Sequence, residues 1–198
     1  MLQKQNIVVF DFDGTLSERD SSVEFGKYCL KKSYKSFAYL PILFMAFVGR
    51  MLNPAGLWWR ETMRFFISPK MIHELAPSFI KQHRNKRFDW AKRQVAKERA
   101  LGNKVVLISA GVDYLVPHLV SDIKFDAVLT SKMNKEKPWH YDFLCWGSNK
   151  VIALDNWAKE NKIIPNVVRS YSDSKSDLPI MNIAKEQVWI DRKTGLRK

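Results

Sequence analysis

The sequence is poor in cysteine, with only Cys29 and Cys145 among its 198 residues. The two lie far apart along the chain, and neither has a histidine at metal-ligand spacing. This argues against a disulfide framework and against a zinc site. Residues 1–5 also lack the basic start and apolar run that are typical of a signal peptide. We therefore expect a reducing, cytoplasmic setting.

Acidic residues are scarce as well. There are 20 Asp and Glu against 33 Lys and Arg, which gives a net charge of +13. So large a charge on a short chain predicts attraction to polyanions, namely a phosphorylated substrate, nucleic acid or an anionic membrane surface. The charge by itself does not choose among them.

The chain does contain short apolar segments, several of them rich in β-branched residues, that are typical of buried strands. They cover residues 6–10, 104–108, 127–130, 167–171 and 187–190. Because helical segments alternate with them, they predict a parallel sheet whose functional groups gather at the carboxyl ends of the strands.

Two stretches fall outside this pattern. Residues 16–100 have almost no strand signal and are too long for a simple crossover, which predicts an inserted helical lobe. The polar and basic end of the chain, residues 191–198, is expected to fray.

Two carboxylates directly follow the first predicted strand. One residue separates Asp11 from Asp13, and Gly14 gives the chain freedom to turn behind them. Such a pair can bind a hard cation, or one member can be a nucleophile while the other moves protons. Taken alone, an Asp-x-Asp pair is more often a solvated turn.

Anion-binding groups follow other predicted elements. Ser109 and Ala110 directly follow the second strand, where a hydroxyl and exposed backbone N–H groups make either an anion cradle or an ordinary N-cap. Lys150 opens a predicted helix, where its charge could neutralise a nucleophile and phosphoryl oxygens. Spacing does not distinguish it from the other basic residues.

Two more carboxylates follow the fourth predicted strand. Asp173 could complete a Mg²⁺ site with Asp11, since this ion takes only one or two carboxylates from a protein. Asp177 fits either a supporting contact to that site or a plain helix start.

In this order, these segments resemble the four motifs of the haloacid dehalogenase superfamily, over nearly the whole chain. The four are residues 11–16 (DFDGTL), residues 108–111 (ISAG), Lys150 and residues 172–179 (SDSKSDLP). The resemblance is closest to the branch that contains the phosphoserine phosphatases. It implies an α/β fold with a Rossmann-like, three-layer parallel sheet and a helical cap inserted after the first strand. The implied domains are a core of residues 1–16 plus 101–198 and a cap of residues 17–100.

The resemblance further implies a Mg²⁺-dependent phosphatase that works through an aspartyl phosphate. The catalytic residues would be Asp11, as nucleophile, and Asp13, as general acid and base. The phosphate-binding residues would be Ser109, Ala110 and Lys150. The metal would be held by Asp11, the backbone carbonyl of Asp13, and Asp173, with Asp177 supporting the site from behind.

The substrate is the subject of a separate prediction from residues 25–60, which contain no Asp or Glu. Residues 37–48 form an apolar run shorter than the roughly 20 residues of a membrane-spanning helix. Its basic flanks and aromatic ends are typical of an element lying in a membrane interface, although a cap also needs a core. The bacterial phosphatidylglycerophosphate phosphatases of this branch have a similar stretch. We therefore predict a lipid phosphate as substrate, with residues 34–60 peripheral on the inner face of the membrane.

Three alternatives remain. Phosphoserine is the main competing substrate, although this chain has the shorter Asp20 where phosphoserine phosphatases typically have a Glu that meets the substrate ammonium. Basic residues 81–87 and 92–99 suggest a nucleic-acid binder, but no recognised module accompanies them and no specific nucleic acid is expected. A membrane-binding protein with a vestigial site is disfavoured because the motifs are complete.

Overall fold

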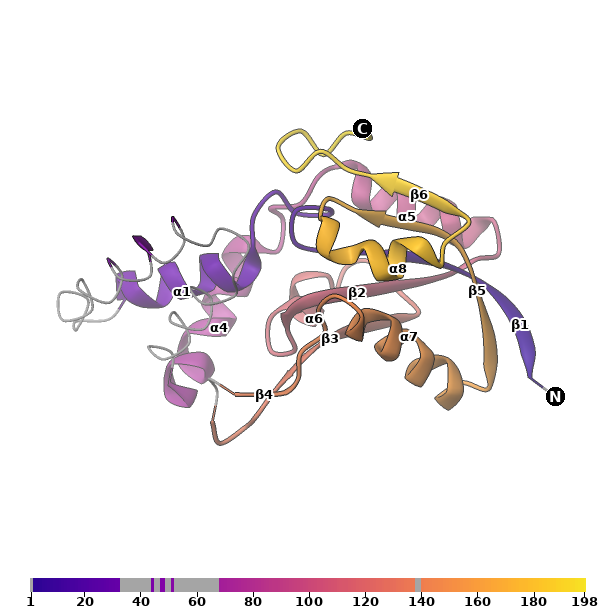
Figure 1. Ribbon diagram of the computed structural model, residues 1–198. Coiled ribbons are helices and arrows are strands. Elements are labelled where there is room, and N and C mark those ends of the chain that lie inside the picture. Colours follow the sequence, from indigo (N-terminus) through magenta and orange to yellow (C-terminus); the bar gives the residue numbers. More distant parts are fainter. Residues whose placement is uncertain (1, 33–43, 45–46, 49–50, 52–67, 138–139) are drawn as a thin grey trace.

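A six-stranded sheet with the order β4-β3-β2-β1-β5-β6 forms the centre of the molecule (Figure 1). The computed structural model describes residues 2–32, 44, 47–48, 51, 68–137 and 140–198. The strands are β1 Gln3–Phe10, β2 Lys104–Val112, β3 Ala127–Met133, β4 Tyr141–Phe143, β5 Ile163–Ser172 and β6 Glu186–Trp189. All pairings are parallel except that of β4 with β3 at the edge of the sheet.

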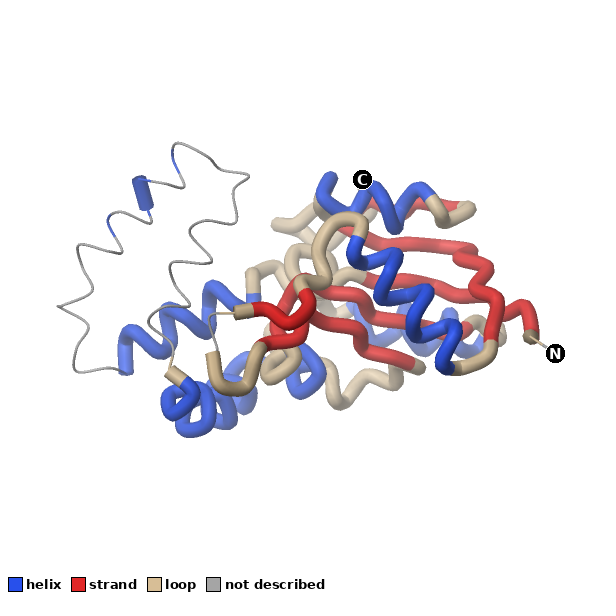
Figure 2. Tube along the Cα trace, turned by 60° about the horizontal axis from the view of Figure 1, so that its bottom comes forward, coloured by secondary structure: helices blue, strands red, loops and turns tan. Residues whose placement is uncertain are grey.

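Helices cover both faces of the sheet and extend beyond one end of it (Figures 1 and 2). They are α1 Ser21–Lys32, α4 Pro69–His83, α5 Trp90–Ala100, α6 Val116–Leu119, α7 Asn149–Glu160 and α8 Leu178–Asn182, with a 3₁₀ turn at Lys175–Asp177. Alternate residues of β1 divide between the two faces, as expected for a strand buried on both sides. Phe10 lies in one apolar cluster with Val95 of α5, whereas Val9 lies in another with Leu154 of α7. The three-layer α/β prediction, with helices inserted after the first strand, is confirmed.

The strand predictions were wrong in two places. β4 was missed, because it has only three residues and none of them is buried. The second strand was predicted to end at Ile108, but β2 continues to Val112 because the pairing with β3 resumes at Ser131. The helix that follows β2 is only the short α6.

The end of the chain was also predicted wrongly, since residues 191–198 form a closed turn instead of fraying. The amide of Asp191 donates to the carbonyl of Leu196 at 2.7 Å, and that of Lys198 donates to the carbonyl of Trp189 at 2.8 Å. The polar and basic composition gave no sign of this order, because the turn is stabilised by contacts with residues that are distant in the sequence.

Part of the predicted cap lies outside the described residues. The undescribed residues of the cap are 33–43, 45–46, 49–50 and 52–67, and they include most of the predicted membrane segment 34–60. Within that segment, the described Phe44, Phe47 and Met51 are exposed. α5 lies inside the predicted cap range of 17–100 but packs against β2 and the main sheet. The division into residues 1–16 plus 101–198 and residues 17–100 stays a prediction.

A buried acidic residue joins α5 to the sheet. Glu98 is fully buried, and its carboxylate accepts hydrogen bonds from Arg169 and Tyr171 of β5. Asn103 and Gln94 donate to the same carboxylate at 3.0 and 2.9 Å.

We expect Glu98→Ala to lower the free energy of unfolding by about 2–4 kcal/mol, because it leaves buried donors without an acceptor. Urea denaturation measures the change. Lys97→Ala, on the exposed side of the same helix, should cost less than about 0.5 kcal/mol. Equal stabilities of the two variants would contradict this role of Glu98.

Candidate active site

Asp11 stands at the carboxyl end of β1, in the middle of the sheet, and is only 8% exposed. Its amide donates to the carbonyl of Tyr171 at 3.0 Å, which continues the pairing with β5. The chain then turns sharply, because the amides of Thr15, Leu16 and Ser17 all donate to the carbonyl of Phe12. The carboxyl ends of β1 and β5 lie side by side because the pairing of the two strands extends to Asp11.

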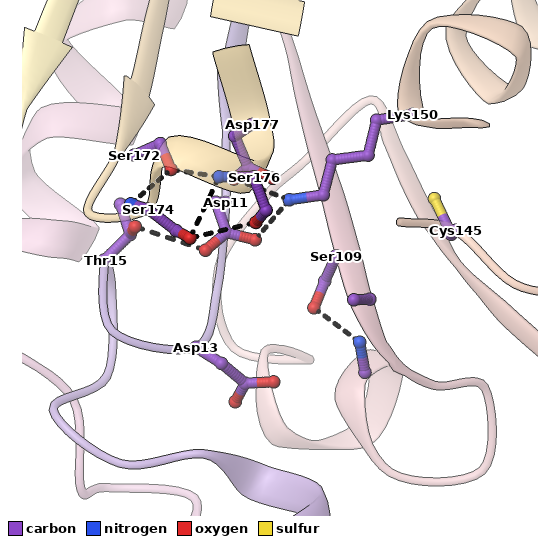
Figure 3. A network of polar contacts seen from close by, with 12 residues as sticks. Asp11, Asp13, Thr15, Ser109, Cys145, Lys150, Ser172, Ser174, Ser176 and Asp177 are labelled. Atoms are coloured by element: carbon purple, nitrogen blue, oxygen red, sulfur yellow. Dashed lines mark hydrogen bonds and ion pairs between the residues drawn. The ribbon is translucent and has the colours of Figure 1, made fainter. Parts of the chain in front are cut away.

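Lys150 connects two carboxylates in the interior (Figure 3). Its Nζ donates to Oδ1 of Asp11 and to Oδ2 of Asp177, each at 2.7 Å, and its side chain is 2% exposed. Ser172 donates to the same Oδ2 of Asp177 at 2.7 Å. Asp177 starts α8 without capping it through its side chain, so its carboxylate serves Lys150 instead of the helix.

Burial governs the electrostatics of this ion pair. It raises the pKa of Asp11 to about 7 even though Lys150 opposes the shift. Burial would lower the pKa of Lys150, but the two carboxylates outweigh it and raise that pKa above its ordinary value. The lysine is therefore a fixed positive charge beside Asp11, which is the arrangement that attracts an anionic group.

Thr15 brings the carboxylates of Asp11 and Asp173 to the same place. Its Oγ1 lies 3.2 Å from Oδ2 of Asp11 and 3.2 Å from Oδ1 of Asp173. The amide of Asp173 donates to the same hydroxyl at 3.0 Å. Sequence reasoning assigned no role to Thr15, although it belongs to the first motif.

Gly14 makes room for Asp173. It has a φ of +87°, and a Cβ added there would lie 2.2 Å from Oδ2 of Asp173. Any side chain at this position would therefore displace the carboxylate that faces Asp11.

We expect Gly14→Ala to lower the catalytic activity of this site at least about tenfold and the free energy of unfolding by about 2–4 kcal/mol, since backbone strain adds to the clash. Gly102→Ala is a matched control, because Gly102 has a similar φ of +80° but nothing within 4 Å of an added Cβ. It should carry the backbone cost of about 1 kcal/mol and keep its activity. Full activity in Gly14→Ala would show that the position of the Asp173 carboxylate beside Gly14 is not needed for catalysis.

Asp13 points to the other side of the loop, away from Asp177 (Figure 3). Its carboxylate accepts the amide of Ser21 at 2.7 Å and the hydroxyl of Ser21 at 3.1 Å, at the first residue of α1. A Cβ added at Gly111 would lie 3.2 Å from both Oδ2 of Asp13 and Oγ of Ser109. Asp13 and Ser109 therefore both lie close to Gly111, where Cγ2 of Val116 also packs at 2.5 Å from the same Cβ position.

Ser109 and Ala110 directly precede Gly111 in β2. The hydroxyl of Ser109 is buried and accepts the amide of Gly111 at 2.9 Å. The carbonyl of Ala110 accepts the hydroxyl of Ser131 at 2.8 Å.

Asp20 caps α1. Its Oδ1 accepts the amides of Ser22 and Val23, each at 3.1 Å. Its predicted contact with a substrate ammonium stays a prediction.

The donor set suits magnesium. Carboxylate oxygens of Asp11 and Asp173 both approach the Thr15 hydroxyl, and the carbonyl of Asp13 belongs to the loop between Asp11 and Thr15. The described residues contain no cluster of three or more His, Cys, Asp or Glu side chains arranged for a metal. Magnesium does not need one, because water and substrate oxygens complete its shell. Burial raises the pKa of Asp173 as well, so a cation here would relieve the cost of two nearby buried carboxylates.

Sequence comparison places the chain in a known family. The haloacid dehalogenase-like hydrolase family matches residues 8–182. The chain is 20% identical to a histidinol-phosphatase of Neisseria meningitidis serogroup C over 216 residues, covering 98% of this chain and 94% of that protein. It is 32% identical to a phosphoserine phosphatase of Lactococcus lactis subsp. lactis over 90 residues, covering 43% of this chain and 41% of that protein.

Solved structures agree on the fold. A substrate-bound phosphoserine phosphatase complex superposes with a TM-score of 0.65 at 15% identity, covering 95% of this chain and 87% of that one. A phosphoserine phosphohydrolase-like protein from Francisella tularensis gives a TM-score of 0.61 at 19% identity, covering 96% and 87%. The chain therefore belongs to the haloacid dehalogenase-like hydrolase family. Within it, the chain is a phosphatase, a phosphoric monoester hydrolase.

Proposed function

We propose that this phosphatase is Mg²⁺-dependent, hydrolyses a small soluble phosphomonoester and forms an aspartyl phosphate on Asp11. The observation that carries the proposal is the position of Asp11. It is a buried carboxylate with Lys150 at 2.7 Å on one oxygen and the hydroxyl shared with Asp173 at 3.2 Å on the other. A nucleophilic carboxylate needs such positive and hydrogen-bonding partners to accept a phosphoryl group.

In the first half-reaction, a carboxylate oxygen of Asp11 attacks phosphorus, and the bond from phosphorus to the alcohol oxygen breaks. Asp13, arriving protonated, gives its proton to the leaving alkoxide. Lys150 offsets the negative charge of the phosphoryl oxygens, and Ser109 donates to them from the opposite side. A magnesium ion held by Asp11, Asp173 and the carbonyl of Asp13 would supply further positive charge against the same oxygens.

In the second half-reaction, Asp13 acts as a base. It takes a proton from the water that attacks phosphorus, and the bond between phosphorus and Asp11 breaks. Inorganic phosphate leaves and Asp13 is again protonated. Ser21, which donates twice to the Asp13 carboxylate, suits the stage at which Asp13 is ionised.

The substrate class follows from the relatives. The histidinol-phosphatase and phosphoserine phosphatase names both point to phosphate esters of primary alcohols with an amine on the neighbouring carbon. They support a small amino-alcohol phosphate better than the lipid phosphate predicted from the sequence. Asp20, beside Asp13 at the start of α1, is the acidic side chain that we propose for the ammonium.

Phosphate release from a substrate panel tests the proposal. We expect L-histidinol phosphate or phosphoserine to be hydrolysed faster than sugar phosphates or phosphatidic acid, with activity lost on chelation and restored by Mg²⁺. Hydrolysis that persists in excess chelator, or none on any phosphomonoester, would contradict the proposal.

A lipid phosphate at a membrane surface is the second candidate, and one observation favours it. Phe44, Phe47 and Met51 are 66%, 60% and 68% exposed, so three large apolar side chains of this segment are accessible to a lipid surface. No helix within the described part of the chain has the length and apolar character to cross a bilayer. Co-sedimentation with anionic vesicles that is lost in Phe44→Ser and Phe47→Ser, together with hydrolysis of vesicle-borne phosphatidylglycerophosphate, would favour this candidate over the first.

A further inference from the structure

The end of the chain comes close to the metal-binding carboxylates proposed above. β6 pairs with β5 in a register that sets Trp189 opposite Ser172, and the amide of Ile190 donates to the carbonyl of Ser172 at 2.9 Å. Asp173 is the residue after Ser172. The chain that follows β6 therefore emerges directly beside it.

The turn at residues 191–198 has a defined shape. Oδ1 of Asp191 accepts the amides of Lys193 and Thr194, each at 3.0 Å. Gly195 has a φ of +70°, and an added Cβ would lie 2.5 Å from the ring of Phe88. The turn thus packs on Phe88, whose amide donates to the carbonyl of Leu16, the last residue of the first motif.

This turn holds Arg192 against the active site. Its Nε donates to the carbonyl of Glu18 at 3.2 Å, and its Nη1 lies 4.0 Å from Oδ2 of Asp173. The Arg192 side chain is half exposed, whereas that of Asp173 is only 8% exposed. The guanidinium therefore stands at the solvent side of Asp173, much as Lys150 stands at the inner side of Asp11.

We propose that Arg192 is a positioning residue that sets the balance between cation and anion binding at this site. The inference rests on the proposed metal site at Asp11 and Asp173. A guanidinium anchored beside a metal-binding carboxylate opposes a divalent cation and attracts a phosphate dianion, because both lie within the range of its field. It would thereby weaken the binding of the cation and strengthen the binding of phosphate.

The test measures two dissociation constants directly, without turnover. Mn²⁺ binding is followed by electron paramagnetic resonance of the free ion, and inorganic phosphate binding by calorimetry at saturating Mg²⁺. In Arg192→Gln we expect roughly threefold tighter binding of Mn²⁺ and roughly threefold weaker binding of phosphate. The effects are modest because solvent screens a half-exposed charge. Arg192→Lys keeps the charge and should bind both ions like the wild type.

Arg197→Gln is the matched control. Arg197 lies in the same turn, but its Nη2 pairs with Glu186 at 2.6 Å. This variant removes the same charge from the same turn and should leave both constants unchanged. Unchanged dissociation constants in Arg192→Gln would overturn the inference and show that Arg192 has no role in ion binding. Weaker binding of both ions together with a lower melting temperature would also overturn it and would indicate a merely structural role.

Asp173→Asn separates this inference from the proposed function. If Asp173→Asn binds Mn²⁺ as tightly as the wild type, the metal site is misassigned and the proposed function fails, and the inference fails with it. If Asp173→Asn loses Mn²⁺ while Arg192→Gln equals the wild type, only the role of Arg192 is wrong.

Discussion

Asp11→Asn is expected to lower the turnover number for an aryl phosphate by at least about a thousandfold, because an amide is a poor nucleophile and cannot form the aspartyl phosphate. The substitution keeps the shape of the side chain. Steady-state phosphate release at saturating Mg²⁺ measures the effect.

The fold should survive this substitution. Burial raises the pKa of Asp11 to about 7, which means that its charged form is costly in the folded protein, and Asn removes that cost. Lys150 still has Asp177 as a partner. Asp155→Asn, on the exposed side of α7, is the control and should keep wild-type activity. Equal rates for Asp11→Asn and Asp155→Asn would refute the nucleophile assignment.

Lys150→Met is expected to lower both the turnover number and the free energy of unfolding. Turnover should fall by about a hundredfold or more, because no buried cation then faces the phosphoryl oxygens. The free energy of unfolding should fall by about 3–5 kcal/mol, since two buried carboxylates, Asp11 and Asp177, lose their shared partner. Urea denaturation and phosphate release measure the two effects separately.

A second substitution distinguishes the two roles of Lys150. Adding Asp177→Asn to Lys150→Met removes one uncompensated carboxylate, so it should recover part of the lost stability and none of the lost turnover. Lys159→Met, at an exposed position of the same helix, should change neither quantity. Near wild-type turnover in Lys150→Met would exclude this lysine from phosphate binding.

The central part of the fold could be predicted from the sequence. The cores of β1 and β2 are continuous apolar runs, and a strand buried on both faces leaves that signal without help from its neighbours. Because parallel strands share a carboxyl edge, the prediction also brought Asp11 and Asp173 together. Thr15, which lies 3.2 Å from a carboxylate oxygen of each, now supports that expectation.

Features that depend on distant contacts could not be predicted. The turn at residues 191–198 is polar and basic, and its order comes from Gly195 against Phe88, more than 100 residues earlier in the sequence. β4 is three residues long and owes its strand character to pairing with β3. Arg192 is one of 33 basic residues, and no local pattern marks it as the one beside Asp173.

Capture of the covalent intermediate tests the central claim most directly. The protein is mixed with Mg²⁺ and a hydrolysed phosphomonoester, quenched in acid during turnover, digested and analysed by mass spectrometry. We predict one added phosphoryl group on the peptide that contains Asp11, located on that residue. A phosphoryl group on another side chain, or an unmodified Asp11 peptide during rapid turnover, would contradict the account.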